Sequence, residues 1–133
     1  MLINLLPDFL DILAHADPEA AYRRFLEAHR PLLAAYWNNY VLDLDSPHAD
    51  SVIASAMRAD RSDLLALLSE VDVAQLVEDA LHRAEDVLQV DRATDCVLMV
   101  GMGAANAGEL VVNGRGVAFV CVEHFTGRVN PET

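Results

Sequence analysis

The sequence contains no lysine: its nine basic residues are all arginines, against 21 acidic residues, and the formal net charge is −12. Proteins bind nucleic acids largely by neutralising phosphates with lysine and arginine side chains. A strongly acidic surface should repel phosphate backbones and acidic lipid surfaces alike. We therefore expect neither a nucleic acid nor a membrane as a partner, and we interpret the charge first as a coding-bias or solubility feature.

We expect neither a signal peptide nor a membrane span, and the chain is poor in cysteine. No apolar run approaches the length of a membrane span, and the apolar N-terminus has no basic flank and is interrupted early by Asp8 and Asp11. We expect a cytoplasmic protein. Its two cysteines, Cys96 and Cys121, lie among valine, leucine, methionine and phenylalanine. In such surroundings cysteine behaves as a small buried apolar residue, which we favour over a disulfide or a reactive thiol.

The length of 133 residues suits one domain. A compact chain of this size buries roughly two-thirds of its unfolded surface. No internal repeat, low-complexity segment or linker divides the sequence. We therefore expect a single domain over residues 1–133, organised as a helical region (1–90), a strand and hairpin region (95–125) and a polar tail (126–133).

Helix signals dominate the first ninety or so positions. Asp17 before Pro18 is typical of an N-cap followed by a proline in the first turn, and Ser46 before Pro47 repeats the pattern. Asp72 opens the most regular helix, whose apolar residues recur at i, i+3, i+4 and i+7 and should pack on the C-terminal sheet. These apolar residues are Val73, Leu76, Val77, Ala80, Leu81, Ala84, Val87 and Leu88.

The strand-like residues gather in the C-terminal third. Cys96–Val100 is a continuous apolar run, which is typical of a strand buried on both faces. Two further apolar runs, Leu110–Val112 and Val117–Val122, flank Asn113 and Gly114, which tolerate the positive φ of a type I′ hairpin turn. The sequence therefore predicts an α+β fold, in which five or six helices precede a small, mainly antiparallel sheet of about three strands.

Two segments invite a ligand-binding interpretation that their context does not support. The glycine-rich stretch 101–106 follows a strand, as in dinucleotide-binding folds, but a hairpin and not a helix comes next. We interpret it as a turn between strands. Asp43, Asp45 and Asp50 offer oxygen ligands for a hard cation, but they miss the calcium-loop spacing. The loop before Pro47 is better explained as the start of a helix.

Glu123 and His124 are the only adjacent acid and imidazole in the strand region. At the end of a straight strand their side chains point to opposite faces, so they cannot chelate one ion unless the chain bends. His-Glu-x-x-His, Cys-x-x-Cys and Gly-x-Ser-x-Gly motifs are all absent. We therefore assign no complete set of catalytic residues, no single catalytic residue and no metal ligand from the sequence.

Three segments carry a resemblance to a known family: Val-Gly-Met-Gly-Ala-Ala-Asn-Ala-Gly (100–108), Val-Val-Asn-Gly-Arg-Gly-Val-Ala-Phe-Val (111–120) and Val-Glu-His-Phe (122–125). They are similar to the segment upstream of the active-site helix in a family of predicted zinc-dependent proteases of the zincin type. In that family a helical N-terminal region leads into a sheet, and a helix with His-Glu-x-x-His follows. The resemblance covers roughly the last forty residues, and the helices only in general layout.

The zinc-binding helix of the family is missing from this sequence, so no zinc ligand or general base carries over. The resemblance implies a non-catalytic N-terminal portion of such a peptidase, inactive alone, with zinc expected only if a downstream segment exists. It further implies Asn106, Gly108 and Glu123 as substrate contacts, and a sheet edge that holds an extended peptide. The alternative is a self-contained binding or interaction module, with a peptide or protein partner or a second copy at the sheet edge.

Overall fold

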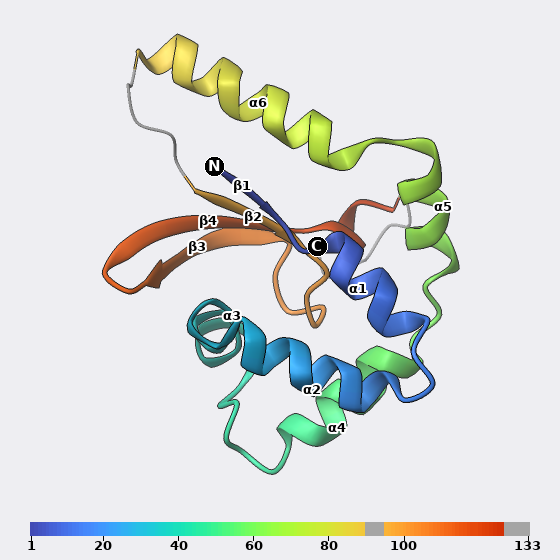
Figure 1. Cartoon of the computed structure of the whole chain (residues 1–133). Helices are drawn as coiled ribbons and strands as arrows, with labels where there is room; N and C mark the ends of the chain where they lie inside the picture. Colours follow the sequence, from blue (N-terminus) through green and yellow to red (C-terminus); the bar gives the residue numbers. More distant parts are fainter. Residues whose placement is uncertain (90–94, 127–133) are drawn as a thin grey trace.

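The computed structural model describes residues 1–89 and 95–126, and within them six α-helices accompany one four-stranded sheet (Figure 1). The α-helices are α1 (Leu6–Leu13), α2 (Pro18–Ala28), α3 (Arg30–Tyr36), α4 (Ala49–Arg58), α5 (Ser62–Glu70) and α6 (Val73–Leu88). The strands are β1 (Leu2–Asn4), β2 (Cys96–Met99), β3 (Ala107–Val112) and β4 (Arg115–Cys121). Two short irregular helices complete the described chain, the π-helix η1 (Trp37–Val41) and the 3-10 helix η2 (Val122–Phe125).

The predicted α+β class is confirmed, but the sheet differs in its pairing. Its strand order is β1-β2-β4-β3, with β1–β2 and β2–β4 parallel and only β3–β4 antiparallel. The sheet is therefore mixed and not mainly antiparallel. Two features differ from the prediction: β2 pairs with β4 in parallel, and β1 adds a strand of three residues that sequence analysis missed. Parallel partners need a long crossover, and the whole helical region supplies the one between β1 and β2.

The hairpin between β3 and β4 forms as predicted. Asn113 and Gly114 have φ values of 51° and 78°, and Val112 pairs with Arg115 across the turn. The turn residues therefore adopt the positive φ that a two-residue hairpin requires. Cys96–Met99 is buried along its full length, also as predicted, and both cysteines are free and buried.

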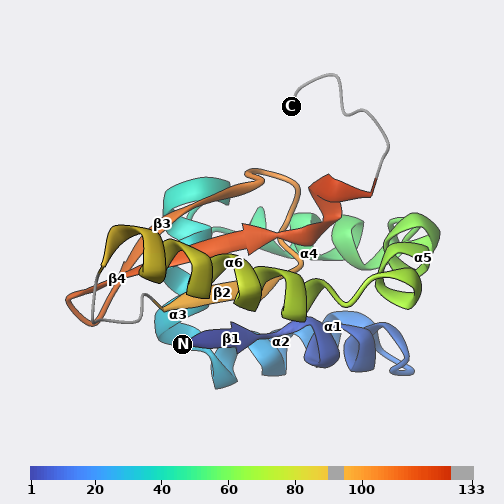
Figure 2. The same cartoon turned by 90° about the horizontal axis from the view of Figure 1, so that it is seen from above.

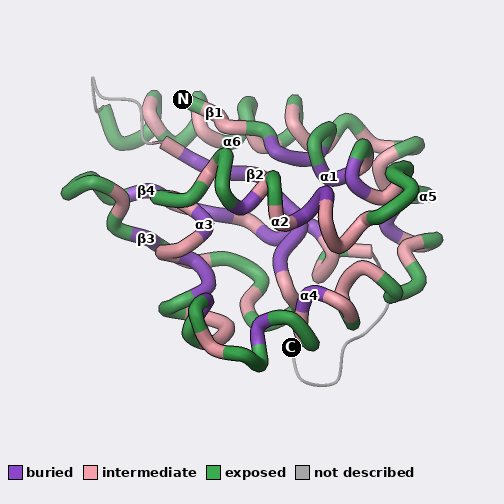
Figure 3. Tube along the Cα trace, turned by 60° about the horizontal axis from the view of Figure 1, so that its bottom comes forward, coloured by how far each residue is buried: buried purple, intermediate pink, exposed green. Residues whose placement is uncertain are grey.

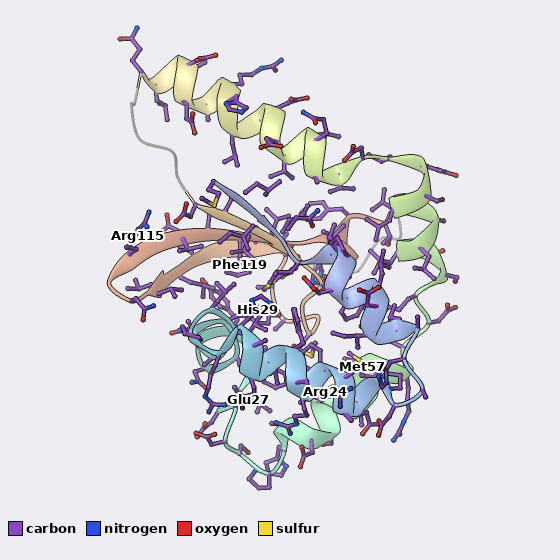
Figure 4. The ribbon with its side chains drawn as sticks, in the orientation of Figure 1. Arg24, Glu27, His29, Met57, Arg115 and Phe119 are labelled. Atoms are coloured by element: carbon purple, nitrogen blue, oxygen red, sulfur yellow. The ribbon has the colours of Figure 1, made fainter. Side chains whose placement is uncertain are left out.

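Helices α2, α3 and α4 lie on one side of the sheet, and the larger core lies between them and the strands (Figure 1). Trp37 and Tyr22 are fully buried there, and the Trp37 indole N–H donates to the Tyr22 hydroxyl at 3.2 Å. Phe119 of β4 (Figure 4) meets the ring of Tyr40 at 5.0 Å and that of Tyr36 at 5.5 Å. This aromatic layer fixes α3 and η1 against the sheet.

Helix α6 lies over the opposite side of the sheet, whereas α1 and α5 lie near the end of the strands and both contribute residues to the core on this side (Figure 2). Phe9, Leu98 and Val122 form a smaller core with Leu64. Helix α6 begins after the predicted N-cap, Asp72, whose carboxylate accepts the Gln75 N–H. None of its residues is buried, however, and Figure 3 shows exposed segments along it where the strands are buried. The predicted apolar stripe exists, but the sheet covers only part of it.

Within the described residues, no helix combines the length and the apolar character needed to cross a membrane. The polar tail predicted from residue 126 onward lies outside the described residues except for Thr126.

Candidate functional site

The chain bends immediately after β4, which corrects the expected geometry of Glu123 and His124. Strand β4 ends at Cys121, and Glu123 and His124 belong to η2. A 3-10 helix turns by about 120° per residue, so neighbouring side chains no longer point to opposite faces as they do in a strand. As a result the His124 Nε2 atom lies 3.7 Å from Glu123 Oε1. That nitrogen is buried and has no hydrogen-bond partner within the described chain.

Glu123 holds the first residue of the glycine-rich turn. Both of its carboxylate oxygens lie 3.0 Å from the backbone nitrogen of Gly101, whose N–H they share. The next N–H, that of Met102, donates to the hydroxyl of Tyr36 at 2.9 Å. The turn after β2 is thus anchored by one side chain from η2 and one from α3.

Gly101 is required here because neighbouring atoms leave no room for a side chain. A Cβ atom at this position would lie 2.5 Å from the Tyr36 hydroxyl, 2.8 Å from Cys121 Sγ and 3.0 Å from Glu123 Oε1. Gly103 is required for a different reason, a φ of 80° that residues with side chains rarely adopt. The stretch that sequence analysis interpreted as a turn is confirmed as one, between β2 and β3.

A recess of about 500 Å³ lies between α4 and this turn. Arg61 and Glu123 place a cation and an anion in its wall, beside Met102 and Gly103. The Arg61 guanidinium donates to the Ala56 carbonyl at 3.0 Å. Burial lowers the pKa of Arg61, and the nearby Glu123 charge acts in the opposite direction. The recess therefore has one charge of each sign in its wall, and both charged groups also contact the backbone.

The nucleophilic side chains around the turn are held in their neutral forms. Burial raises the pKa of the Cys121 thiol, and the charge of Glu123 raises it further. The same two effects raise the pKa of the Tyr36 hydroxyl. Burial also raises the pKa of Cys96, and that of Tyr22 to about 12. Because a thiolate and not a thiol is the nucleophile, the raised pKa makes Cys121 a poorer nucleophile than an exposed cysteine.

The three residues implied as substrate contacts do not converge. Glu123 lines the recess, whereas Asn106 is exposed and accepts the Cys121 N–H through its backbone carbonyl at 2.8 Å. Gly108 lies in β3 under an aromatic pair, and a Cβ there would approach the Tyr40 hydroxyl to 2.7 Å and Phe119 to 2.9 Å. Gly108 therefore serves packing, and Asn106 serves the backbone of the turn.

Two residues of the site were not found by sequence analysis, namely Tyr36 and Arg61. Tyr36 meets the turn from 66 positions away, and no local pattern signals such a contact. Arg61 lies just before α5 and stacks over the Phe9 ring, with 5.5 Å between the guanidinium carbon and the ring centroid. Its position between an acidic and a serine residue looks like an ordinary helix start in the sequence.

The aspartates with a metal-like spacing serve as local partners. Asp43 accepts the Asp45 N–H at 3.0 Å, and Asp45 lies 3.5 Å from Arg30. Asp50 forms an ion pair with Arg23. Within residues 1–89 and 95–126, no group of three or more histidine, cysteine, aspartate or glutamate side chains is arranged to hold a metal ion.

Comparisons of the chain with protein-family models, with curated proteins and with solved structures find no significant match.

Proposed function

We propose that this chain is the non-catalytic N-terminal portion of a zincin-like zinc-dependent peptidase, and that it does not hydrolyse peptides by itself. The proposal takes its family from the resemblance of residues 100–125. The claim that the chain is non-catalytic is supported by the hydrogen bonds of Glu123 and Tyr36. Both bind backbone N–H groups of the turn, Gly101 and Met102, so their polar atoms support the sheet instead of facing a substrate.

Peptide hydrolysis of the zincin type requires a metal-activated water and a carboxylate base. Among the described residues that line the recess, Glu123 is the one carboxylate, and its oxygens already accept a hydrogen bond from the backbone. Cys121, the nearest thiol, is neutral. In this proposal the described residues contribute a supported sheet and turn, and a downstream His-Glu-x-x-His segment contributes the metal and the base.

The test is a zinc titration of the purified chain by calorimetry, combined with melting curves and a peptidase assay. We expect no stoichiometric binding, no more than a small change in Tm and no peptide cleavage. Glu123→Gln provides the matched control, since it should behave toward zinc as the wild type does. Tight binding of one zinc ion that Glu123→Gln abolishes would overturn the proposal. Translation of the reading frame beyond Thr133 tests the family part, because a stop codon there would remove it.

The alternative, a self-contained interaction module, finds limited support at the sheet edges. The Glu109 carbonyl of edge strand β3 already accepts a hydrogen bond from the Tyr40 hydroxyl at 2.9 Å. A partner strand that adds to this edge would have to compete with Tyr40 for that carbonyl. The other edge strand, β1, has three residues. An exposed surface on α6 favours this alternative more strongly than either edge does.

A further inference from the structure

We propose that α6 is a self-association surface, through which two copies of this chain pair antiparallel about a twofold axis. The surface, hereafter the α6 strip, comprises Leu76, Asp79, Ala80, Arg83, Ala84 and Val87, and Leu88 adjoins it. These residues line one groove of about 610 Å³ along the helix. The inference concerns assembly only, and neither zinc nor peptidase activity enters its test.

The apolar face of α6 is wider than the part the sheet covers. Val73, Ala74 and Val77 are partly buried against the core around Phe9 and Leu98. Residues of an α-helix follow one another at 100°, so Leu76, Ala80 and Val87 lie to one side of that contact. Leu76 is 60% exposed, Val87 74% and Leu88 68%. Large apolar side chains clustered in this way are typical of an interaction surface.

The order of residues along the α6 strip matches itself when the helix direction is reversed. With the twofold axis passing near Leu81, Leu76 of one copy faces the partner's Val87, and Ala80 faces the partner's Ala84. The two small alanines lie closest to the axis and let the helix backbones approach, while the larger residues close the ends of the contact. Such a palindromic arrangement is what an isologous dimer requires.

The charges on the α6 strip also fit a second copy. The same antiparallel register places Asp79 opposite the partner's Arg83, twice per dimer. Within the described residues Arg83 forms no ion pair, whereas Arg23, Arg58 and Arg115 each have a carboxylate partner. One oxygen of Asp79 accepts the Gln75 side-chain N–H, which leaves the other oxygen for the partner.

The presence of one acidic and one basic residue, Asp79 and Arg83, favours a second copy of this chain as the partner that binds the α6 strip. A net charge of −12 makes two copies repel at long range, so an association surface between them needs local charges of opposite sign. A basic segment of another protein would suit an acidic strip. The α6 strip instead carries Asp79 and Arg83 side by side, which a second antiparallel copy matches in both places.

Sedimentation velocity of the full chain over a range of concentrations tests the proposal. We expect a reversible dimer that Val87→Glu converts to a monomer, because a carboxylate would then lie in the apolar contact. Val111→Glu is the matched control: Val111, on β3, is 71% exposed and lies outside the α6 strip. It should leave the dimer intact. Circular dichroism would establish that both variants are folded. A chain that stays monomeric throughout would overturn the proposal, and so would a dimer that Val111→Glu dissociates and Val87→Glu does not.

A charge exchange tests the register itself. Asp79→Arg and Arg83→Asp should each weaken dimerisation by roughly tenfold or more, since each sets like charges opposite one another. The double variant restores opposite charges at both contacts and should recover most of the wild-type affinity. If the double variant is as weak as the product of the two single effects, the antiparallel pairing is wrong.

Discussion

Both carboxylate oxygens of Glu123 lie 3.0 Å from the backbone nitrogen of Gly101, although 22 positions separate the two residues. The contact ties η2, which follows the central strand β4, to the turn that follows its neighbour β2. The Glu123 side chain is only 11% exposed, so water competes weakly for the carboxylate. A hydrogen bond to a carboxylate is stronger than one between neutral groups. Glu123 therefore stabilises the fold at the point where a functional role was sought.

The first prediction follows from this contact. Glu123→Gln keeps one acceptor oxygen and the side-chain volume but removes the charge, so we expect the free energy of unfolding to fall by about 1 kcal/mol. Glu123→Ala removes the acceptor and leaves the Gly101 N–H without its partner, at a cost of about 2–3 kcal/mol. Urea denaturation at pH 7 measures both. The exposed Glu109 provides the control, because Glu109→Gln should change stability by less than about 0.5 kcal/mol. Equal effects at the two positions would contradict this role for Glu123.

The second prediction compares two glycines that differ in their surroundings. Gly101→Ala forces a Cβ within 2.5 Å of the Tyr36 hydroxyl and 2.8 Å of Cys121 Sγ, and the cost should be about 1–3 kcal/mol. A Cβ at Gly116 meets nothing within 4 Å. Gly116→Ala should therefore be neutral or stabilise by up to about 1 kcal/mol, because alanine restricts the unfolded chain.

Thermal and urea unfolding measure the stability of both glycine variants. If steric crowding is the reason for Gly101, Gly101→Ala should lower the free energy of unfolding and Gly116→Ala should leave it unchanged or raise it. A Gly101→Ala variant as stable as the wild type would mean that Tyr36 and Glu123 move away without loss. The double variant Tyr36→Phe with Gly101→Ala separates the causes. Tyr36→Phe alone should lower stability, because the Met102 N–H loses its acceptor. It also removes the closest contact of the new Cβ, so Gly101→Ala should cost less in the Tyr36→Phe background than in the wild type.

The features that sequence analysis predicted correctly are those fixed by nearby residues. Asp17 and Asp72 cap α2 and α6 because a carboxylate three residues before an N–H reaches it within one helical turn. Asn113 and Gly114 form the hairpin because both accept positive φ. In each case the residues that determine the structure lie within a few positions of one another, so a single sequence is sufficient to find them.

The features that sequence analysis missed depend on distant partners. Strand β1 pairs Ile3 with Val97, and three residues carry no periodic pattern of their own. The contact between Tyr36 and Met102 likewise joins a helix to a turn far along the chain. Periodicity showed that Leu76 and Val87 share the apolar side of α6, but it does not show what covers that side. The fold class could therefore be predicted, whereas the wall of the recess and the exposed strip could not.

The third prediction concerns alkaline pH, where the two buried thiols oppose folding. Burial raises the pKa of Cys96 and Cys121 above their ordinary value of 9.0, and it raises that of Tyr22 from 10.0 to about 12. The folded state therefore keeps these groups protonated while the unfolded chain ionises. The unfolded state binds fewer protons above pH 9, so the free energy of unfolding should be nearly constant from pH 7 to 8 and fall from pH 9 upward. Each fully ionising group contributes up to about 1.4 kcal/mol per pH unit.

Urea denaturation under reducing conditions at pH 7, 8, 9 and 10 measures this loss, and Cys121→Ala separates the thiol from other causes. The variant loses packing and should be less stable than the wild type at pH 7, because Cys121 is fully buried. Its stability should nevertheless decline less steeply between pH 9 and 10, since one ionising group has been removed from the unfolded chain. Parallel declines in the two proteins would show that the Cys121 thiol ionises equally well in the folded state. That result would mean that water or a counter-charge reaches the thiolate, although the Cys121 side chain is fully buried in the folded protein.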